Sequence, residues 1–94
     1  MNFSDCLPVG GSLSLGFTQS NSSVSMLNGT VTSEFPVRVQ IVESPLGFEG
    51  VIYSQNDTTS AHFRDIHLLP KVEYAVIITN LGQNNSLSVN LRFS

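Results

Sequence analysis

The chain has 94 residues, a formal net charge of −3 and 12% charged side chains, about half of the usual share of roughly 25%. This length allows one domain, residues 1–94, because two halves would each be too small for a stable core. The four basic residues are scattered along the sequence, whereas nucleic acid and anionic membrane surfaces require clustered cations. The longest apolar run, residues 74–78, is far too short to span a bilayer, so we expect no membrane insertion.

From residue 13 onward, apolar and polar residues alternate with the period of two that is typical of β-strands. No window shows a helical stripe, so the sequence predicts an all-β protein. The predicted inward positions, in chain order, are Leu13, Leu15, Phe17, Val24, Met26, Val31, Phe35, Val37, Val39, Ile41, Val51, Tyr53, Phe63, Tyr74, Val76, Ile78, Leu87, Val89, Leu91 and Phe93.

Turn-forming residues separate these runs. They occur in QSNSS (19–23), NGT (28–30), SPLG (44–47), QNDTTS (55–60) and LGQNNS (81–86), and NGT holds the Asn-Gly pair of a tight hairpin. Strands at this spacing predict an antiparallel two-sheet β-sandwich, jelly-roll-like, of seven or eight short strands. Residues 74–78 are apolar on both faces, which predicts a central strand; alternatively, Ile77 faces a partner.

The first ten residues form an arm that we interpret as an edge strand, a flexible tail or a strand that pairs with a neighbouring subunit. Phe3, Leu7 and Val9 share one parity, as a strand lying on a core requires. Cys6 is the only cysteine, so it is either an unpaired thiol or a link to another chain. The candidate intermolecular contacts are therefore Phe3, Cys6, Leu7 and Val9.

The segment IHLLPKVEYAVIITNLGQNNSLSVNLRF resembles the final hairpin of small extracytoplasmic jelly-roll domains. Tyr74, Ile78 and Asn80 match the rhythm of the Golgi-dynamics (GOLD) domain and of the bacterial pre-peptidase C-terminal domain. The GOLD pattern also has a disulfide; Cys6 matches its first cysteine, but Ile77 stands where the second would be. The resemblance implies a non-catalytic interaction module.

HFRDIH, residues 62–67, is the only cluster of titratable side chains, and a metal site or a general base is the functional interpretation. On a straight strand His62 and His67 point to opposite faces, so we interpret the segment as an exposed polar edge. QNDTT could offer oxygens to calcium, but a solvated turn fits it better. We predict no catalytic residues, no metal and no cofactor.

Five Asn-x-Ser/Thr sequons make Asn2, Asn21, Asn28, Asn56 and Asn84 candidate glycosylation sites, all in predicted loops or the tail. Ser, Thr and Asn replace the missing charge, as is common in secreted and cell-surface proteins. The first residues lack the basic region and apolar core of a signal peptide, so the chain is either cytosolic or a trimmed mature domain. The surface composition favours an extracellular, cell-surface or secretory-lumen location.

The sequence therefore predicts a non-enzymatic, extracytoplasmic interaction module that binds a protein partner or associates with itself. The alternative is a module that binds carbohydrate or another small ligand through loop residues. Sugar binding by β-sandwiches often uses exposed aromatic platforms, and only Phe3 and Phe48 are aromatic residues in predicted loops.

Overall fold

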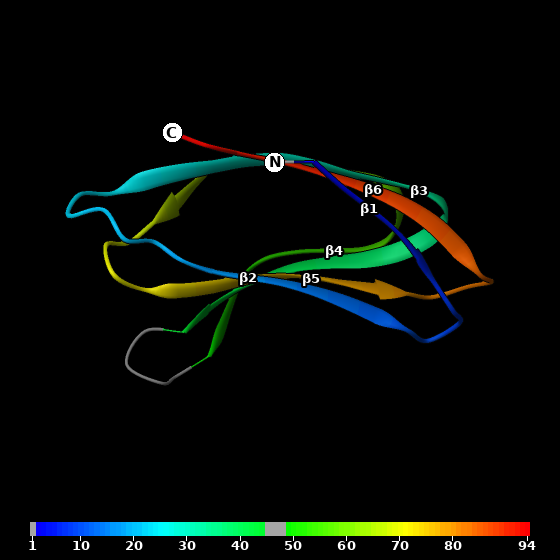
Figure 1. Cartoon of the computed structure of the whole chain (residues 1–94). Helices are drawn as coiled ribbons and strands as arrows, with labels where there is room; N and C mark the ends of the chain where they lie inside the picture. Colours follow the sequence, from blue (N-terminus) through cyan, green and yellow to red (C-terminus); the bar gives the residue numbers. More distant parts are fainter. Residues whose placement is uncertain (1, 45–48) are drawn as a thin grey trace.

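The computed structural model describes residues 2–44 and 49–94, and in these ranges the protein consists of β-strands without helix. This confirms the all-β prediction (Figure 1). It also means that no helix in the described ranges could cross a membrane. The strands are β1 (Asn2–Leu7), β2 (Ser12–Thr18), β3 (Ser25–Ser44), β4 (Gly50–Leu68), β5 (Glu73–Asn80) and β6 (Asn85–Phe93).

Two of these strands are much longer than the sequence predicted: β3 has 20 residues and β4 has 19. Asn28–Gly29 and residues 55–60, both predicted to be turns, lie inside β3 and β4 respectively. Segments predicted as separate short strands are thus joined, and the described ranges contain six strands where seven or eight were expected for the chain. The predicted turn at 44–47 lies largely outside the described residues.

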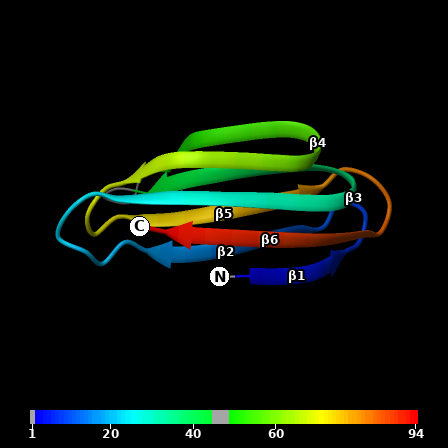
Figure 2. The same ribbon diagram turned by 90° about the horizontal axis from the view of Figure 1, so that it is seen from above.

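The strands form one antiparallel sheet in the order β1-β6-β3-β5-β2, with β4 paired along β3. Residues 27–33 of β3 pair with β6, and residues 37–44 pair with β5. Because β3 changes partner between these segments, the sheet curls and its two halves lie face to face (Figure 1). Figure 2 shows β4 running along β3 on the side away from β6. The two sheets that the sequence predicted are therefore continuous, because the long strands β3 and β4 run through both of them.

The corner in β3 is held by the side chain of Asn85, which is buried at the start of β6. Asn85 Oδ1 accepts hydrogen bonds of 3.1 Å from the backbone N–H groups of Glu34 and Phe35, and its Nδ2 donates to Phe35 O at 2.7 Å. The next residue, Pro36, has no N–H to satisfy. Side-chain bonds therefore replace the ladder where the strand changes partner.

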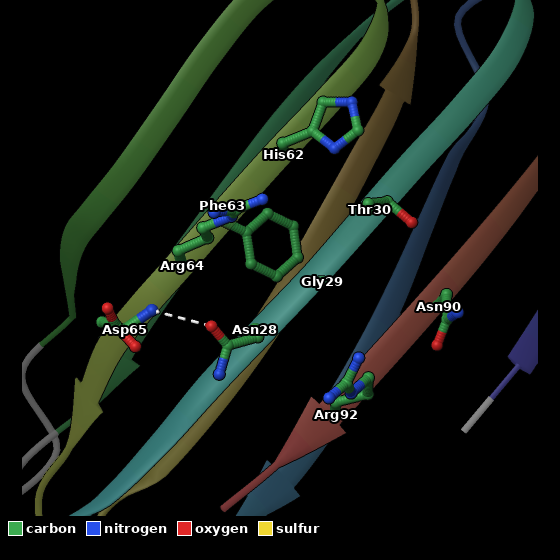
Figure 3. Close-up of a pocket in the computed structure, with 9 residues that line it drawn as sticks. All are labelled: Asn28, Gly29, Thr30, His62, Phe63, Arg64, Asp65, Asn90 and Arg92. Atoms are coloured by element: carbon green, nitrogen blue, oxygen red, sulfur yellow. Dashed lines mark hydrogen bonds between the residues drawn. The ribbon is translucent and has the colours of Figure 1, made fainter.

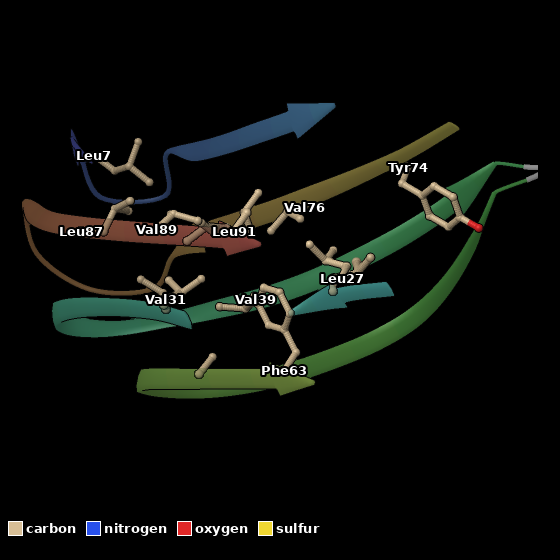
Figure 4. Packing of buried hydrophobic residues seen from close by; sticks show 14 of the residues in the cluster. Leu7, Leu27, Val31, Val39, Phe63, Tyr74, Val76, Leu87, Val89 and Leu91 are labelled. Carbon is tan, nitrogen blue, oxygen red and sulfur yellow. The ribbon is translucent and has the colours of Figure 1, made fainter. Parts of the chain in front are cut away.

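The core lies between the two halves of the curled sheet, which face each other (Figure 4). Its predicted centre is confirmed, because the alternating residues of three runs are buried: Val37, Val39 and Ile41; Tyr74, Val76 and Ile78; Leu87, Val89 and Leu91. Strand β5 is central, as predicted, with β3 on one side and β2 on the other. Its second face, which carries Ala75 and Ile77, is half-buried.

The predicted facing is wrong at several positions near the strand ends. Ser25 and Leu27 are buried in place of Val24 and Met26, because two backbone hydrogen bonds between Met26 and Ser94 continue the register of β3 with β6. The buried Ser25 hydroxyl is satisfied by donating to Ser94 O.

Val51 is 55% exposed, because β4 has one extra residue between the pairs Ile41↔Tyr53 and Val42↔Val51 and Val51 therefore lies opposite Val42. Phe93 keeps the predicted side, opposite the buried Leu27 and with its ring 5.0 Å from that of Phe17, although it is 46% exposed.

The N-terminal arm is strand β1, and it pairs with β6 of its own chain. Of the four candidate contacts with a second chain, Leu7 is buried in the core and Phe3 packs against it. Cys6 and Val9 are exposed, and Cys6 Sγ lies 3.4 Å from Ser86 Oγ. For these two residues the intermolecular contact stays a prediction.

The turn after β1 is fixed by Asn80, which is 1% exposed. Asn80 Nδ2 donates to Leu7 O at 3.1 Å and to Pro8 O at 2.8 Å. The same nitrogen donates to Gln83 O at 2.8 Å, in the loop between β5 and β6. The buried amide of Asn80 thus joins the turn after β1 to the turn after β5. This explains why β5 ends on an Asn.

Candidate functional site

A depression of about 470 Å³ lies over the neighbouring strands β6, β3 and β4. We call it the outer depression, because most of its side chains alternate with the core residues and so face outward. Figure 3 shows it from close by. Its lining residues are Asn28, Gly29, Thr30, His62, Phe63, Arg64, Asp65, Asn90 and Arg92.

Strand register places these side chains in two rows across the sheet. Thr30 pairs with Asn90 on β6 and with His62 on β4, so these three form one row. Arg92 pairs with Asn28, which begins the next row. Residues two apart on a strand are separated by roughly 6.5–7 Å, so the rows are near enough for one ligand to contact both.

A β-bulge completes the second row. Between the pairs Leu27↔Ile66 and Gly29↔Phe63, β4 has one residue more than β3. Asp65 takes up the extra length with a positive φ of 52°, a conformation in which Asp is tolerated. The backbone N–H of Asp65 donates to Asn28 Oδ1 at 3.1 Å, shown as the dashed line in Figure 3. The bulge therefore brings Asp65 to the depression and holds it there.

The same bulge corrects the predicted facing of the two histidines. The extra residue reverses the alternation, so His62 and His67 both lie on the outer face, opposite Thr30 and Met26. Four residues of β-strand separate their rows, which corresponds to about 13 Å. Among residues 2–44 and 49–94 no group of three His, Cys, Asp or Glu residues could hold a metal ion. HFRDIH does lie on an edge strand, and both histidines are exposed.

Gly29 and Phe63 meet at the centre of the depression. A Cβ atom on Gly29 would lie 2.5 Å from Phe63 Cε2 and 2.8 Å from the backbone oxygen of Asn90, so only glycine fits. The Phe63 ring is 1% exposed and packs against Tyr53 with ring centroids 5.4 Å apart. Phe63 therefore belongs to the core and offers no aromatic platform to a ligand.

The depression gathers positive charge in an acidic chain. It contains Arg64 and Arg92, two of the four Lys and Arg residues. Asp65 is its one carboxylate. This site is not evident in the sequence, because the two arginines lie far apart in the chain and are brought together only by the pairing of β3 with both β4 and β6. The alternation did carry a partial signal, since it predicts Asn90 and Arg92 on the outer face.

Two tyrosines outside the depression have raised pKa values. Burial raises the pKa of Tyr53 above its usual value of 10.0. Burial is also the main cause of the raised pKa of Tyr74. The Tyr74 hydroxyl donates to Glu43 Oε2 at 2.8 Å, and this neighbouring carboxylate raises the pKa further. A hydrogen bond from the backbone N–H of Leu69 acts in the opposite direction and lowers the pKa. Both hydroxyls make intramolecular hydrogen bonds, so we assign them to the support of the fold.

The sequons are distributed differently from the prediction. Asn21 and Asn84 lie in exposed loops, as expected, whereas Asn2, Asn28 and Asn56 lie within β1, β3 and β4. Asn28 is half-buried and its amide oxygen is already bonded to Asp65. The structure thus leaves Asn21 and Asn84 as the loop candidates.

No family model matches the chain, and no curated protein matches its sequence. Its fold is similar to that of the Yersinia pseudotuberculosis-derived mitogen, with a TM-score of 0.77 and 9% identity over 97% of this chain and 82% of that chain. It is also similar to TmCBM61, a carbohydrate-binding module in complex with β-1,4-galactotriose, with a TM-score of 0.65 and 13% identity over 97% and 68% of the two chains.

A family two carbohydrate esterase from Clostridium thermocellum, in complex with cellohexaose, matches with a TM-score of 0.52 and 14% identity. The match covers 95% of this chain but 26% of that chain. These likenesses show a jelly-roll-like β fold. Membership of the GOLD or pre-peptidase C-terminal families is not shown.

Proposed function

We propose that this protein is a non-catalytic binding module and that the outer depression is its ligand site. The observation that carries the proposal is the convergence of charged and amide side chains from three strands on one depression of about 470 Å³. Sites for small ligands typically combine a concave surface with a few polar groups that fix orientation. Here the strands hold those groups, instead of the loops that the sequence suggested.

A saccharide fits this lining chemically, because each sugar hydroxyl both donates and accepts hydrogen bonds. The amides of Asn28 and Asn90 and the hydroxyl of Thr30 also do both, whereas Arg64 and Arg92 only donate. Two proteins of similar fold have their structures in complex with β-1,4-galactotriose and cellohexaose. We therefore favour a carbohydrate ligand.

Isothermal titration calorimetry with galactotriose, cellohexaose and sulfated galactotriose tests the proposal. Asn90→Trp would fill the depression, and we expect it to weaken binding at least about tenfold. Ser88→Trp is the matched control, because Ser88 is exposed on the same face of β6 and does not line the depression. Failure of all three saccharides to bind, or equal losses in both variants, would contradict the proposal.

Protein recognition is the second candidate function. The similarity to a mitogen motivates it, as does the exposure of Val51 and Ile52, at 55% and 40%, on the edge strand β4. Edge strands with exposed apolar residues favour pairing with another chain. Self-association through β1 belongs to the same class. Under this alternative, Val51→Lys would abolish binding of the protein partner to the edge strand β4, whereas Asn90→Trp would leave that binding unchanged.

We further propose an extracytoplasmic location, in the secretory lumen, at the cell surface or outside the cell, with the protein glycosylated. The low share of charged residues, 12%, and the exposed loop sequons at Asn21 and Asn84 support it. Secreted from eukaryotic cells, the protein should lose mass on enzymatic removal of N-glycans, and Asn21→Gln with Asn84→Gln should abolish that loss. An unmodified mass in the secreted protein would argue against glycosylation.

A further inference from the structure

We propose that the ligand of the outer depression carries an anionic group, a carboxylate or a sulfate on a saccharide, bound by Arg64 and Arg92. This inference rests on the proposed function and narrows its ligand class. It follows from the distribution of charge across the molecule and from the position of Arg64 and Arg92 on the two strands that flank β3.

The cations of this chain are concentrated in the outer depression. The chain has 4 Lys and Arg against 7 Asp and Glu, yet two of the four cations line a single depression. Within residues 2–44 and 49–94 neither Arg64 nor Arg92 has an ion-pair partner. Two guanidinium groups near each other repel, and an anion bound between them would relieve this repulsion and be attracted by both.

The two arginines lie on the strands that flank β3. Arg92 comes from β6 and Arg64 from β4, and β3 runs between these strands (Figure 3). Neighbouring strands are about 4.8 Å apart, so two side chains as long as Arg can reach a common group above β3. Each guanidinium has five donors in a planar fork that matches carboxylate and sulfate oxygens. Thr30 adds a hydroxyl on the intervening strand.

Asp65 disfavours the binding of an anion, because its carboxylate lies in the same depression. It occupies the bulge with φ 52°, and its contact with Asn28 is made by the backbone N–H and not by the carboxylate. Asn adopts positive φ as readily as Asp does. Asp65→Asn therefore removes one negative charge while it keeps the bulge, and we expect it to strengthen the binding of an anionic ligand.

Calorimetry with three probes tests the inference: β-1,4-galactotriose, the same trisaccharide bearing sulfate esters, and inorganic sulfate. We expect the sulfated trisaccharide to bind at least about tenfold more tightly than the neutral one, since charge-assisted hydrogen bonds are the stronger kind. Arg64→Gln and Arg92→Gln should each weaken the binding of the sulfated trisaccharide about tenfold. Added salt should weaken the binding of the sulfated trisaccharide more than the binding of the neutral one.

Lys71→Gln is the matched control, because it makes the same change in net charge in the exposed turn between β4 and β5. It should change the affinity less than about twofold, while Asp65→Asn should raise it. Unchanged melting temperatures in all variants would show that the fold is intact.

The outcomes separate the two proposals. Equal affinity for the neutral and sulfated trisaccharides would overturn the anionic ligand and leave the saccharide site standing. Equal losses in Lys71→Gln and the Arg variants would also overturn it, because binding would then follow net charge alone. If inorganic sulfate binds as tightly as the sulfated trisaccharide, the sugar contributes nothing and the saccharide class is wrong. Binding of none of the probes would contradict both proposals.

Discussion

At the scale of single residues, Gly29 shows how the core and the outer depression depend on each other. The Phe63 ring from the neighbouring strand occupies the space that a side chain at position 29 would need. Glycine weakens a strand, but an aromatic ring laid over it from the paired strand restores the packing. The Asn-Gly pair therefore serves close packing inside β3, although its sequence is typical of a hairpin turn.

Gly29→Ala should destabilise the fold by about 1–3 kcal/mol, because the new methyl group would press on the Phe63 ring and on the backbone oxygen of Asn90. Urea denaturation measures the change. Gly16→Ala is the control: a Cβ there would lie 3.9 Å from Tyr74 O, an ordinary contact, so its stability should be nearly unchanged. Equal stability of the two variants would show that the ring does not lie over Gly29.

At the scale of secondary-structure elements, alternation of apolar residues predicted the strands of the core well. The runs Val37–Ile41, Tyr74–Ile78 and Leu87–Leu91 all bury the predicted face, because burial between the curled halves of the sheet is the dominant constraint on them. The central pairing of β5 followed from its apolar second face.

Turn chemistry was a weaker guide, since the same residues form bulges. Asp57 and Asp65 both have positive φ, at 55° and 52°, and each takes up an extra residue of β4 without ending the strand. No local pattern distinguishes a bulge from a turn here; the long pairing of β4 with β3 decides it. Since each bulge reverses the alternation, the facing of His67 could not be predicted from the sequence.

The corners between elements are built from buried amides. Asn85 holds the bend of β3, Asn80 holds the turns after β1 and β5, and Asn85 Nδ2 donates to Asn80 Oδ1 at 3.2 Å. Buried polar groups are tolerated when hydrogen bonds satisfy them, as they do here. This network fixes the end of β1 against the loop between β5 and β6.

At the scale of the whole molecule, the curled sheet explains why the candidate site was invisible in the sequence. Residues 28–30, 62–65 and 90–92 come together because β3 pairs with β4 on one side and with β6 on the other. The sequence predicted the strands but not this register, which depends on contacts between distant segments. The charges that looked scattered in a chain of net charge −3 are therefore partly concentrated on one face.

The central claim is that a ligand binds on the sheet face at the outer depression, and an NMR titration tests it most directly. The amide signals of the ¹⁵N-labelled protein would be followed as sulfated galactotriose is added. We predict that the shifted signals cluster at Asn28, Thr30, His62, Arg64 and Arg92, with the loop at 81–84 unchanged. Shifts confined to the loops or to the exposed edge at Val51 and Ile52, or no saturable shifts at all, would contradict the claim.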